Sequence, residues 1–505
     1  MSDKVVVIGT GFGGLAAAIR MRAMGHDVVV VEANEQPGGR ASVFHRDGFV
    51  FDAGPTVITA PYLFEELFRL VGRDPADYFQ LRPVDPFYRV KWEDGQAFDF
   101  VGDDERMYSQ IEQFDARDVD GYRKLVAHSE AIFDKGYTEL ADKPFHDPVT
   151  MLRVAPDLLR LENWRSVHGL VSKYINSDRL RQVFTFEPLL VGGNPYDTSS
   201  IYLLIHWLER KWGVHFAMGG TGELVRALTR LLNELGVPIY YNEPVEQIEV
   251  ERGRAVAVRT NQRRIPCGQI VCNGDPSTVY EKLIHRSKRV WNPDWRINMR
   301  RQSPSLFVAY IGAKGTWEDT AHHTILLGQR YEHLLKDIFH RRILAKDFSL
   351  YLHAPGRTDP SLAPAGHDGF YVLSPIPNEL SGIDWSEHAE PYLDSIVDYL
   401  DKGELPGLKD NLVTKFSVDA RYFSGRLRSK HGAAFGLEPR LSQSAWFRYH
   451  NRSADVRGLY FVGAGTHPGG GLPGVLCSAK VVERLVDAPA RPIALPAPAR
   501  KRATA

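Results

Sequence analysis

Apolar runs and glycine turns are most regular over the first forty residues. Val5–Ile8 is an uninterrupted apolar run, which predicts a short buried strand. Leu15–Met24 has helical apolar spacing, and Asp27–Val31 predicts a second strand. The glycine-rich stretch Gly9–Gly14 (GTGFGG) separates the first strand from the helix. This order predicts an α/β fold that begins with a parallel strand–helix–strand unit.

The remaining pattern predicts several segments of different character. Residues 81 to 215 are mostly helical and rich in aromatic residues, apart from a β-hairpin over Phe87–Phe100. Strands and helices alternate again afterwards. We therefore predict a discontinuous Rossmann-like nucleotide-binding domain (1–80, 216–285 and 456–487), a helical region that contacts substrate and membrane (81–215), a mixed-sheet substrate domain (286–455) and a disordered, Ala/Pro-rich tail (488–505).

The first glycine stretch has the spacing Gly-x-Gly-x-x-Gly. Gly9 permits a tight turn, Gly11 lets the backbone approach a pyrophosphate, and Gly14 lets the helix pack closely on the strand. Free backbone N–H groups at the helix start then favour phosphate. Glu32, at the end of the second strand, suits a ribose diol and favours FAD or NAD over NADP. The motif alone is weak evidence, since an ordinary glycine turn is the alternative, but here it lies in the required context.

The residues after Glu32 favour FAD over NAD. A second glycine pair and an arginine, Gly38-Gly39-Arg40, follow where a nicotinamide domain would enter its next helix. The guanidinium of Arg40 suits pyrophosphate oxygens, although a surface ion pair is the simpler alternative. Near the C-terminus a strand over Gly458–Gly463, a glycine-rich loop and a helix over Gly474–Val486 repeat the arrangement. Backbone N–H groups at that helix start can stabilise the electron-rich edge of a reduced flavin.

Charge and composition narrow the class of protein. The 505 residues include 62 basic and 62 acidic side chains, which argues against a nucleic-acid partner. Three cysteines fit a reducing compartment without a disulfide framework. No signal peptide and no apolar run of about 20 residues is present, so a cytoplasmic location is expected. Residues 151 to 175 mix Leu, Val and Trp with Arg and Lys; this stretch either rests on acidic lipid or packs on a core.

No metal site is expected. His322 and His323 are adjacent, so they point apart in an extended chain, and neither has a partner at ligand spacing. Cys267 and Cys272 are too isolated to suggest a metal.

With these motifs in hand, the chain resembles the bacterial-type phytoene desaturases, FAD-dependent carotenoid desaturases within the amine-oxidase-like flavoprotein superfamily. The glycine motif and Gly-Gly-Arg are superfamily-wide. More specific are four stretches: Phe51–Thr56 (FDAGPT), Tyr351–Pro355 (YLHAP), Asp359–Pro364 (DPSLAP) and Val462–Gly469 (VGAGTHPG). The resemblance covers about residues 4 to 485.

The resemblance implies a set of FAD-contacting residues. It places Val245 at the adenine and Asp275 beside the site. The Gly463–Thr466 turn of this chain carries no acid, whereas many superfamily members have one there. The implied cofactor residues are Gly9, Gly11, Gly14, Glu32, Gly39, Arg40, Gly54, Pro55, Val245, Asp275, Gly463, Gly465, Thr466, Gly474 and Val475.

The implied activity is desaturation of phytoene to neurosporene or lycopene, with oxygen or a quinone as electron acceptor and with peripheral attachment to the cytoplasmic membrane. A long apolar tunnel must align the polyene substrate with the flavin, and the aromatic-rich region is the candidate lining, although ordinary core packing is the alternative. No convincing general base is visible; His467 is the one candidate and can equally pack or cap. Other carotenoid-modifying flavoenzymes (a hydroxyneurosporene or diapophytoene desaturase, a carotene isomerase) and a non-catalytic prenyl-lipid carrier of the same fold remain alternatives.

Overall fold

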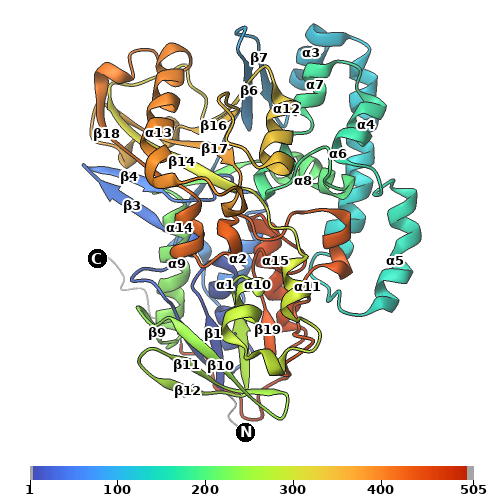
Figure 1. Cartoon of the computed structure of the whole chain (residues 1–505), viewed down its shortest axis with the longest axis vertical. Helices are drawn as coiled ribbons and strands as arrows, with labels where there is room; N and C mark the ends of the chain where they lie inside the picture. Colours follow the sequence, from blue (N-terminus) through green and yellow to red (C-terminus); the bar gives the residue numbers. More distant parts are fainter. Residues whose placement is uncertain (1–3, 498–505) are drawn as a thin grey trace.

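A five-stranded parallel sheet forms one end of the molecule (Figure 1) in the computed structural model, which describes residues 4–497. Its strands come from three distant parts of the chain and have the order β19-β13-β1-β2-β9, with every neighbouring pair parallel. They are β1 (Lys4–Ile8), β2 (Asp27–Val31), β9 (Ile239–Tyr240), β13 (Gln269–Cys272) and β19 (Leu459–Phe461). The predicted α/β class and the Rossmann-like sheet are confirmed.

Both faces of this sheet are covered, which explains its continuous apolar strands. Val5 and Val7 of β1 pack against α1 (Phe12–Ala23), α2 (Tyr62–Arg69), α9 (Thr221–Glu234) and α15 (Leu472–Glu483). Val6 and Ile8 point the other way because side chains alternate along a strand. They pack toward a small antiparallel sheet made of β10 (Val245–Glu251), β11 (Arg254–Thr260) and β12 (Arg264–Pro266).

A second, seven-stranded sheet occupies the opposite end of the molecule (Figure 1). Its order is β18 (Leu412–Val418), β14 (Ser305–Lys314), β17 (His367–Ile376), β16 (Leu350–His353), β15 (His323–Leu327), β6 (Tyr88–Trp92) and β7 (Ala97–Phe100). The sheet is mixed, because β15 and β6 pair in parallel whereas the other pairs are antiparallel. The predicted hairpin therefore forms, but it extends this sheet and does not stay with the helical region.

Several helices of the region 81–215 pack on one face of the second sheet, and α13 (Trp385–Lys402) packs on the other. The helix over Pro148–Arg160 packs on Leu140 and Phe145 instead. Most aromatic side chains of this region form solid core, among them Phe98, Phe100, Tyr122 and Phe184. The helices are α3 (Asp104–Asp115), α4 (Asp118–Phe133), α5 (Pro148–Arg160), α6 (Val167–Tyr174), α7 (Asp178–Val183) and α8 (Leu204–Trp212).

Shorter elements complete the chain. They are β3 (Val43–Arg46), β4 (Phe49–Asp52), β5 (Leu81–Pro83), β8 (His215–Ala217), α10 (Pro276–Thr278), α11 (Asp294–Asn298), α12 (Tyr331–Lys336) and α14 (Ala420–Gly425). Within residues 4–497, no helix is both long enough and apolar enough to span a bilayer.

The C-terminal tail has a defined place over part of its length. It was expected to be disordered from residue 488, but Arg22 donates hydrogen bonds to the carbonyls of Ile493 (2.8 Å) and Ala494 (2.5 Å). The N–H of Ile493 also donates to the carbonyl of Gly25. These bonds fix the tail against the end of α1; residues 498–505 lie outside the described part.

Candidate cofactor and substrate site

One large cavity connects the two sheets. Its volume of about 980 Å³ is at the upper end of the range for small-molecule sites. One end is formed by the glycine turn after β1, and the other by apolar side chains of the second sheet and α8. A single continuous space therefore reaches from a dinucleotide-type turn to an apolar chamber.

The glycine turn leaves the start of α1 open. Gly11 is the residue before α1, and no side chain among the described residues caps the helix there. Gly9 has a φ of +91°, and a Cβ on Gly14 would lie 2.0 Å from the Gly9 carbonyl oxygen. The backbone N–H groups at this helix start are thus available to an anion such as a pyrophosphate.

Glu32 is buried in the cavity wall beside this turn. Its carboxylate accepts hydrogen bonds from the backbone N–H of Thr10 (2.8 Å) and of Asn34 (2.9 Å). These bonds hold the carboxylate at the end of β2, where the sequence predicts a ribose contact.

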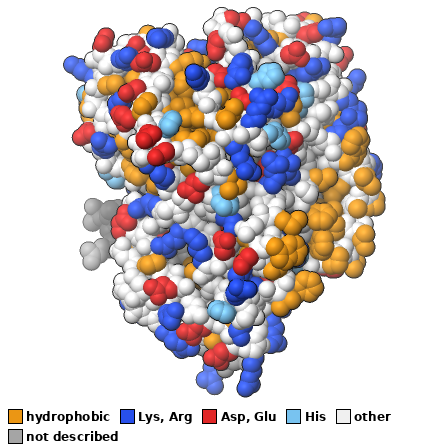
Figure 2. Space-filling view, in the orientation of Figure 1, with side chains coloured by type: hydrophobic (Ala, Val, Ile, Leu, Met, Phe, Trp, Pro, Cys, Tyr) orange, Lys and Arg blue, Asp and Glu red, His pale blue; other side chains and the backbone are white. Residues whose placement is uncertain are grey.

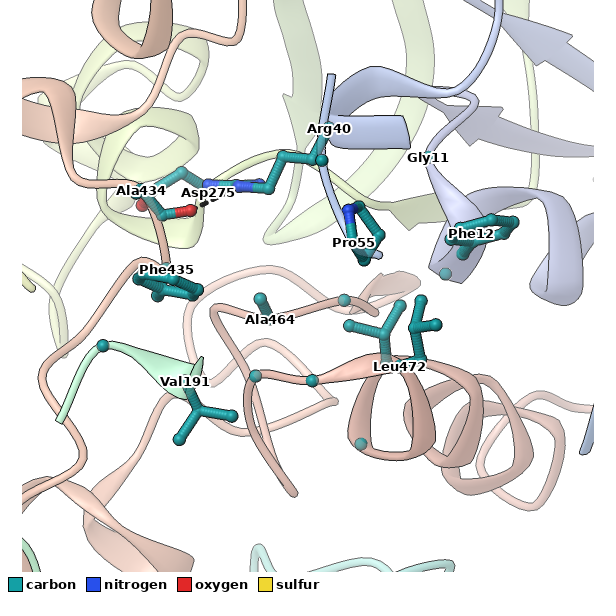
Figure 3. Close-up of a pocket in the computed structure, with 18 of the residues that line it drawn as sticks. Gly11, Phe12, Arg40, Pro55, Val191, Asp275, Ala434, Phe435, Ala464 and Leu472 are labelled. Atoms are coloured by element: carbon teal, nitrogen blue, oxygen red, sulfur yellow. Dashed lines mark hydrogen bonds between the residues drawn. The ribbon is translucent and has the colours of Figure 1, made fainter. Parts of the chain in front are cut away.

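Arg40 reaches across the cavity wall toward residues far away in the sequence (Figure 3). Its Nε donates to the carbonyl of Ala434 (2.6 Å) and its Nη2 donates to Ser429 Oγ (2.9 Å). Burial lowers the pKa of Arg40, and the nearby Asp275 partly offsets this effect. The described hydrogen-bond partners of Arg40 are thus a carbonyl and a hydroxyl of the cavity wall, and not a surface carboxylate.

The predicted cofactor residues are distributed unevenly around the cavity. Gly14, Gly465 and Thr466 do not line it: Gly14 packs on Gly9, and Thr466 is fully buried with its hydroxyl bonded to the Tyr449 carbonyl (2.7 Å). A Cβ on Gly465 would lie 2.3 Å from Pro276 Cδ. The residues that line the cavity are Gly9, Gly11, Glu32, Gly39, Arg40, Gly54, Pro55, Val245, Asp275, Gly463, Gly474 and Val475.

His467 also lines the cavity, in the loop before α15. Its Nε2 lies 3.4 Å from the carbonyl oxygen of Leu140, and its ring packs near Phe145. Burial lowers the pKa of His467 to about 4, so the imidazole is neutral near pH 7.

Several lining residues were not predicted from the sequence. Ala434 and Phe435 close the cavity beside Arg40, and they come from a loop with no recognisable motif (Figure 3). Thr56 and Tyr351 belong to two of the specific stretches, FDAGPT and YLHAP, but no individual role is predicted for either residue. From the aromatic-rich region only some side chains line the cavity, including Tyr137, Phe145, Phe186 and Tyr202.

The two adjacent histidines do not point apart. The ring centroids of His322 and His323 are 4.5 Å apart, and His353 of the neighbouring strand β16 joins them. One ring nitrogen from each lies within 4.8 Å of the other two, and all three side chains are buried. The strand pairing of His323 with His353 brings them together, and this pairing is not visible in local sequence.

The fold and the cavity together define a dinucleotide-binding protein with an attached apolar chamber. The uncapped start of α1 and the glycines that admit no side chain fit the pyrophosphate of FAD.

Comparison with known proteins places the chain more narrowly. A family model described as "Flavin containing amine oxidoreductase" matches residues 12–482. A lycopene-forming phytoene desaturase of Pseudescherichia vulneris is 48% identical over 96% of this chain and 99% of its own length. A neurosporene-forming phytoene desaturase of Cereibacter sphaeroides is 40% identical over 97% of this chain and 95% of its own length. An oxidoreductase from Methanosarcina mazei, 16% identical, has the same fold with a TM-score of 0.65 over 95% of this chain and 100% of its own. The chain belongs to the flavin-containing amine oxidoreductase family and, within it, to the bacterial-type phytoene desaturases.

Proposed function

We propose that this chain is an FAD-dependent phytoene desaturase that introduces several double bonds into phytoene and forms neurosporene or lycopene. The observation that carries this proposal is the single cavity that joins the nucleotide turn to an apolar chamber. The high identity to lycopene-forming and neurosporene-forming desaturases supports it.

In this proposal the cavity-lining residues of the nucleotide sheet hold FAD. Gly11 and the start of α1 bind the pyrophosphate, Glu32 binds the ribose, and Val245 meets the adenine. Asp275, Gly463 and the Gly474–Val475 helix start lie along the ribityl chain and ring. Gly14, Gly465 and Thr466 act by shaping the backbone and not by contact. FAD held there would supply the acceptor for a hydride from the substrate carbon.

The apolar chamber orients the polyene and keeps water away from it. Leu204, Ile205 and Leu208 form one face of α8 toward the cavity. Ile325 and Leu327 of β15 line it from the sheet. Apolar walls favour a hydrocarbon and exclude water from the reacting carbons.

We also propose that the enzyme lies on the cytoplasmic face of the membrane. Exposed apolar side chains gather over α5 at the right of Figure 2, including Leu152 (74% exposed) and Leu159 (64% exposed). Trp295 and Met299, in and after α11, are exposed as well. A surface of this kind, with basic residues such as Arg153, suits an acidic lipid surface.

The same part of the surface adjoins the cavity wall. Met151 and Leu158 of α5 line the cavity, and they pack with Ala445 and Trp446. This position supports entry of phytoene directly from the bilayer. The reduced flavin would then be reoxidised by oxygen or a membrane quinone.

Expression in cells that accumulate phytoene tests the proposal. New visible absorption bands in the pigment extract are expected, and their positions count the double bonds added. Unchanged phytoene beside folded, FAD-containing protein would contradict the assignment. Hydroxylated, C30 and cis carotenoids would then be the substrates to test.

A further inference from the structure

We propose that Thr56, Tyr351 and His323 form the route by which the proton removed from the substrate leaves the cavity. This inference rests on the proposed desaturase function. Each double bond requires loss of hydrogens from two neighbouring carbons. One leaves with its bonding electrons as hydride, which the flavin accepts. The other leaves as a proton, and its C–H electron pair becomes the new C=C bond; that proton needs an acceptor inside a dry chamber.

The three side chains are joined by two short hydrogen bonds. Thr56 Oγ1 lies 2.6 Å from the Tyr351 hydroxyl oxygen, which lies 2.7 Å from His323 Nδ1. Thr56 and Tyr351 line the cavity, whereas His323 is fully buried behind them. Thr56 directly follows Gly54 and Pro55, which line the cofactor end, so the chain of bonds begins beside the proposed flavin position.

The order of donors and acceptors suits proton removal. Burial lowers the pKa of His323 well below its ordinary value, with His322 and His353 adding to the effect, so the imidazole is neutral. With the hydrogen on Nε2, His323 Nδ1 accepts from Tyr351, and Tyr351 accepts from Thr56. An oxygen lone pair of Thr56 is then left for the substrate proton, and two proton shifts deliver that charge to the imidazole.

Beyond His323, the neighbouring histidines provide a way outward. His322 Nε2, His323 Nε2 and both ring nitrogens of His353 have no hydrogen-bond partner among residues 4–497. One ring nitrogen of each residue lies within 4.8 Å of the others, so the proposed route requires the rings to rotate toward one another. His322 Nδ1 is 2.7 Å from the hydroxyl of Thr358, which is partly exposed. Hydroxyls and imidazoles both donate and accept, so every group on this path can pass a proton.

Other titratable residues of the cavity wall suit this role less well. Glu209 accepts a hydrogen bond from Tyr88 (2.6 Å), and burial raises its pKa well above the ordinary value, which favours the protonated carboxyl. His467 Nε2 lies 3.4 Å from the Leu140 carbonyl oxygen, which cannot pass a proton on, and its Nδ1 has no hydrogen-bond partner among the described residues, so no relay continues from this ring. The remaining carboxyls that line the described cavity, Glu32, Glu243, Glu246 and Asp275, belong to the nucleotide-binding end.

Paired variants of the holoenzyme test the route. Thr56→Val and Tyr351→Phe each remove one hydroxyl and keep the shape of the side chain, and Thr56→Ser keeps the hydroxyl. Tyr392→Phe is the matched control, because Tyr392 bonds Ser374 on the same sheet (2.8 Å) but does not line the cavity. The readouts are FAD content, melting temperature and the rate of phytoene conversion.

We expect Thr56→Val and Tyr351→Phe to keep FAD and lose at least about 100-fold in rate, the scale of general acid–base catalysis. Thr56→Ser should keep most activity, and Tyr392→Phe should match the wild type. A structural role alone would not separate Thr56→Ser from Thr56→Val by rate at equal stability. If Thr56→Val loses FAD, Tyr351→Phe decides the question.

Wild-type rates in both hydroxyl-free variants would overturn the route while the desaturase function stands. A wild-type protein that holds FAD and leaves phytoene unchanged would instead refute the function itself. Elemental analysis provides a separate check on the histidines. One bound metal ion per chain, lost in His353→Asn, would show that the three imidazoles are a metal centre and would overturn the proton route.

Discussion

Close backbone packing at Gly14 sets the shape of the nucleotide turn. The residue lies against the Gly9 carbonyl, where a Cβ would come within 2.0 Å. We predict that Gly14→Ala lowers the free energy of unfolding by about 1–3 kcal/mol and releases FAD, because α1 must move away from β1. FAD content after gel filtration and chemical denaturation measure the two effects.

Gly403→Ala is the control for that substitution. Gly403 has a negative φ, and a Cβ there would meet only the Tyr399 carbonyl at 3.4 Å. Its stability should change by about 0.5 kcal/mol or less. Full FAD retention in Gly14→Ala would show that the close approach is not needed.

A buried carboxyl links stability to pH. Burial raises the pKa of Asp52 to about 6 from 3.8, although N–H groups of Thr221 and Gly222 donate to it and oppose the rise. Between these pH values the folded chain binds more protons than the unfolded chain, so Asp52 makes the free energy of unfolding fall as pH rises. A pKa shift of about two units corresponds to about 3 kcal/mol, by which the ionised Asp52 destabilises the folded state above pH 6.

We predict that Asp52→Asn removes this slope. Urea unfolding gives the free energy of unfolding of both proteins at each pH between 4 and 7. The measured quantity is the wild-type value minus the variant value. That difference should fall by about 2.4 kcal/mol over the window. The Asn side chain has one acceptor oxygen instead of two, so the variant also loses one hydrogen bond from a backbone N–H. This loss changes the free energy of unfolding of the variant by the same amount at every pH. A difference independent of pH would contradict the raised pKa.

The sequence predicted residues whose role is local and missed those whose role depends on distant contacts. Gly9, Gly11 and Glu32 line the cavity because one strand–turn–helix unit positions them. Thr56 and Tyr351 meet only after β16 takes its place in the second sheet, so no spacing in the sequence pairs them. His322, His323 and His353 gather for the same reason, and their predicted lack of a metal stays a prediction.

At the scale of elements, α5 is the helix with the most exposed apolar face. We predict that Leu152→Gln with Leu159→Gln weakens binding to vesicles of anionic and neutral phospholipid at least about tenfold. Each leucine placed in lipid contributes up to about 1.5–3 kcal/mol. Vesicle flotation measures the bound fraction, and high salt should weaken binding further because Arg153 and Arg160 face solvent there.

Val413→Gln on β18 is the matched control, since Val413 is 48% exposed on the second sheet, away from α5. It should leave vesicle binding unchanged. Equal binding by the α5 double variant and the wild type would contradict the membrane assignment for this helix.

Elements followed from sequence wherever the signal was local, but their ends did not: α1 begins at Phe12, three residues before the predicted start at Leu15. The hairpin β6–β7 was predicted from its alternation around Asp94-Gly95. Its parallel pairing with β15, more than 200 residues later, depends on long-range packing that periodicity does not record. The tail shows the same limit: its composition predicted disorder, but Arg22 provides partners for the Ile493 and Ala494 carbonyls.

At the scale of the whole molecule, the parallel sheet and the mixed sheet both contribute to the wall of one cavity. The parallel sheet presents an open helix start to an anion, and the mixed sheet and α8 present an apolar wall. The fold class could be predicted because each chain segment of the nucleotide-binding domain contains an apolar strand pattern that is visible in its own sequence. The residue boundaries between the predicted domains stay predictions.

The most direct test of the account is anaerobic reduction of the bound flavin by phytoene. Purified, FAD-loaded protein on vesicles that contain phytoene should lose its oxidised flavin absorbance, with about one double bond formed per flavin. Oxygen or a quinone should then restore the oxidised spectrum and allow further desaturation. A flavin that stays oxidised while phytoene persists would contradict the claim that this cavity brings the polyene to FAD.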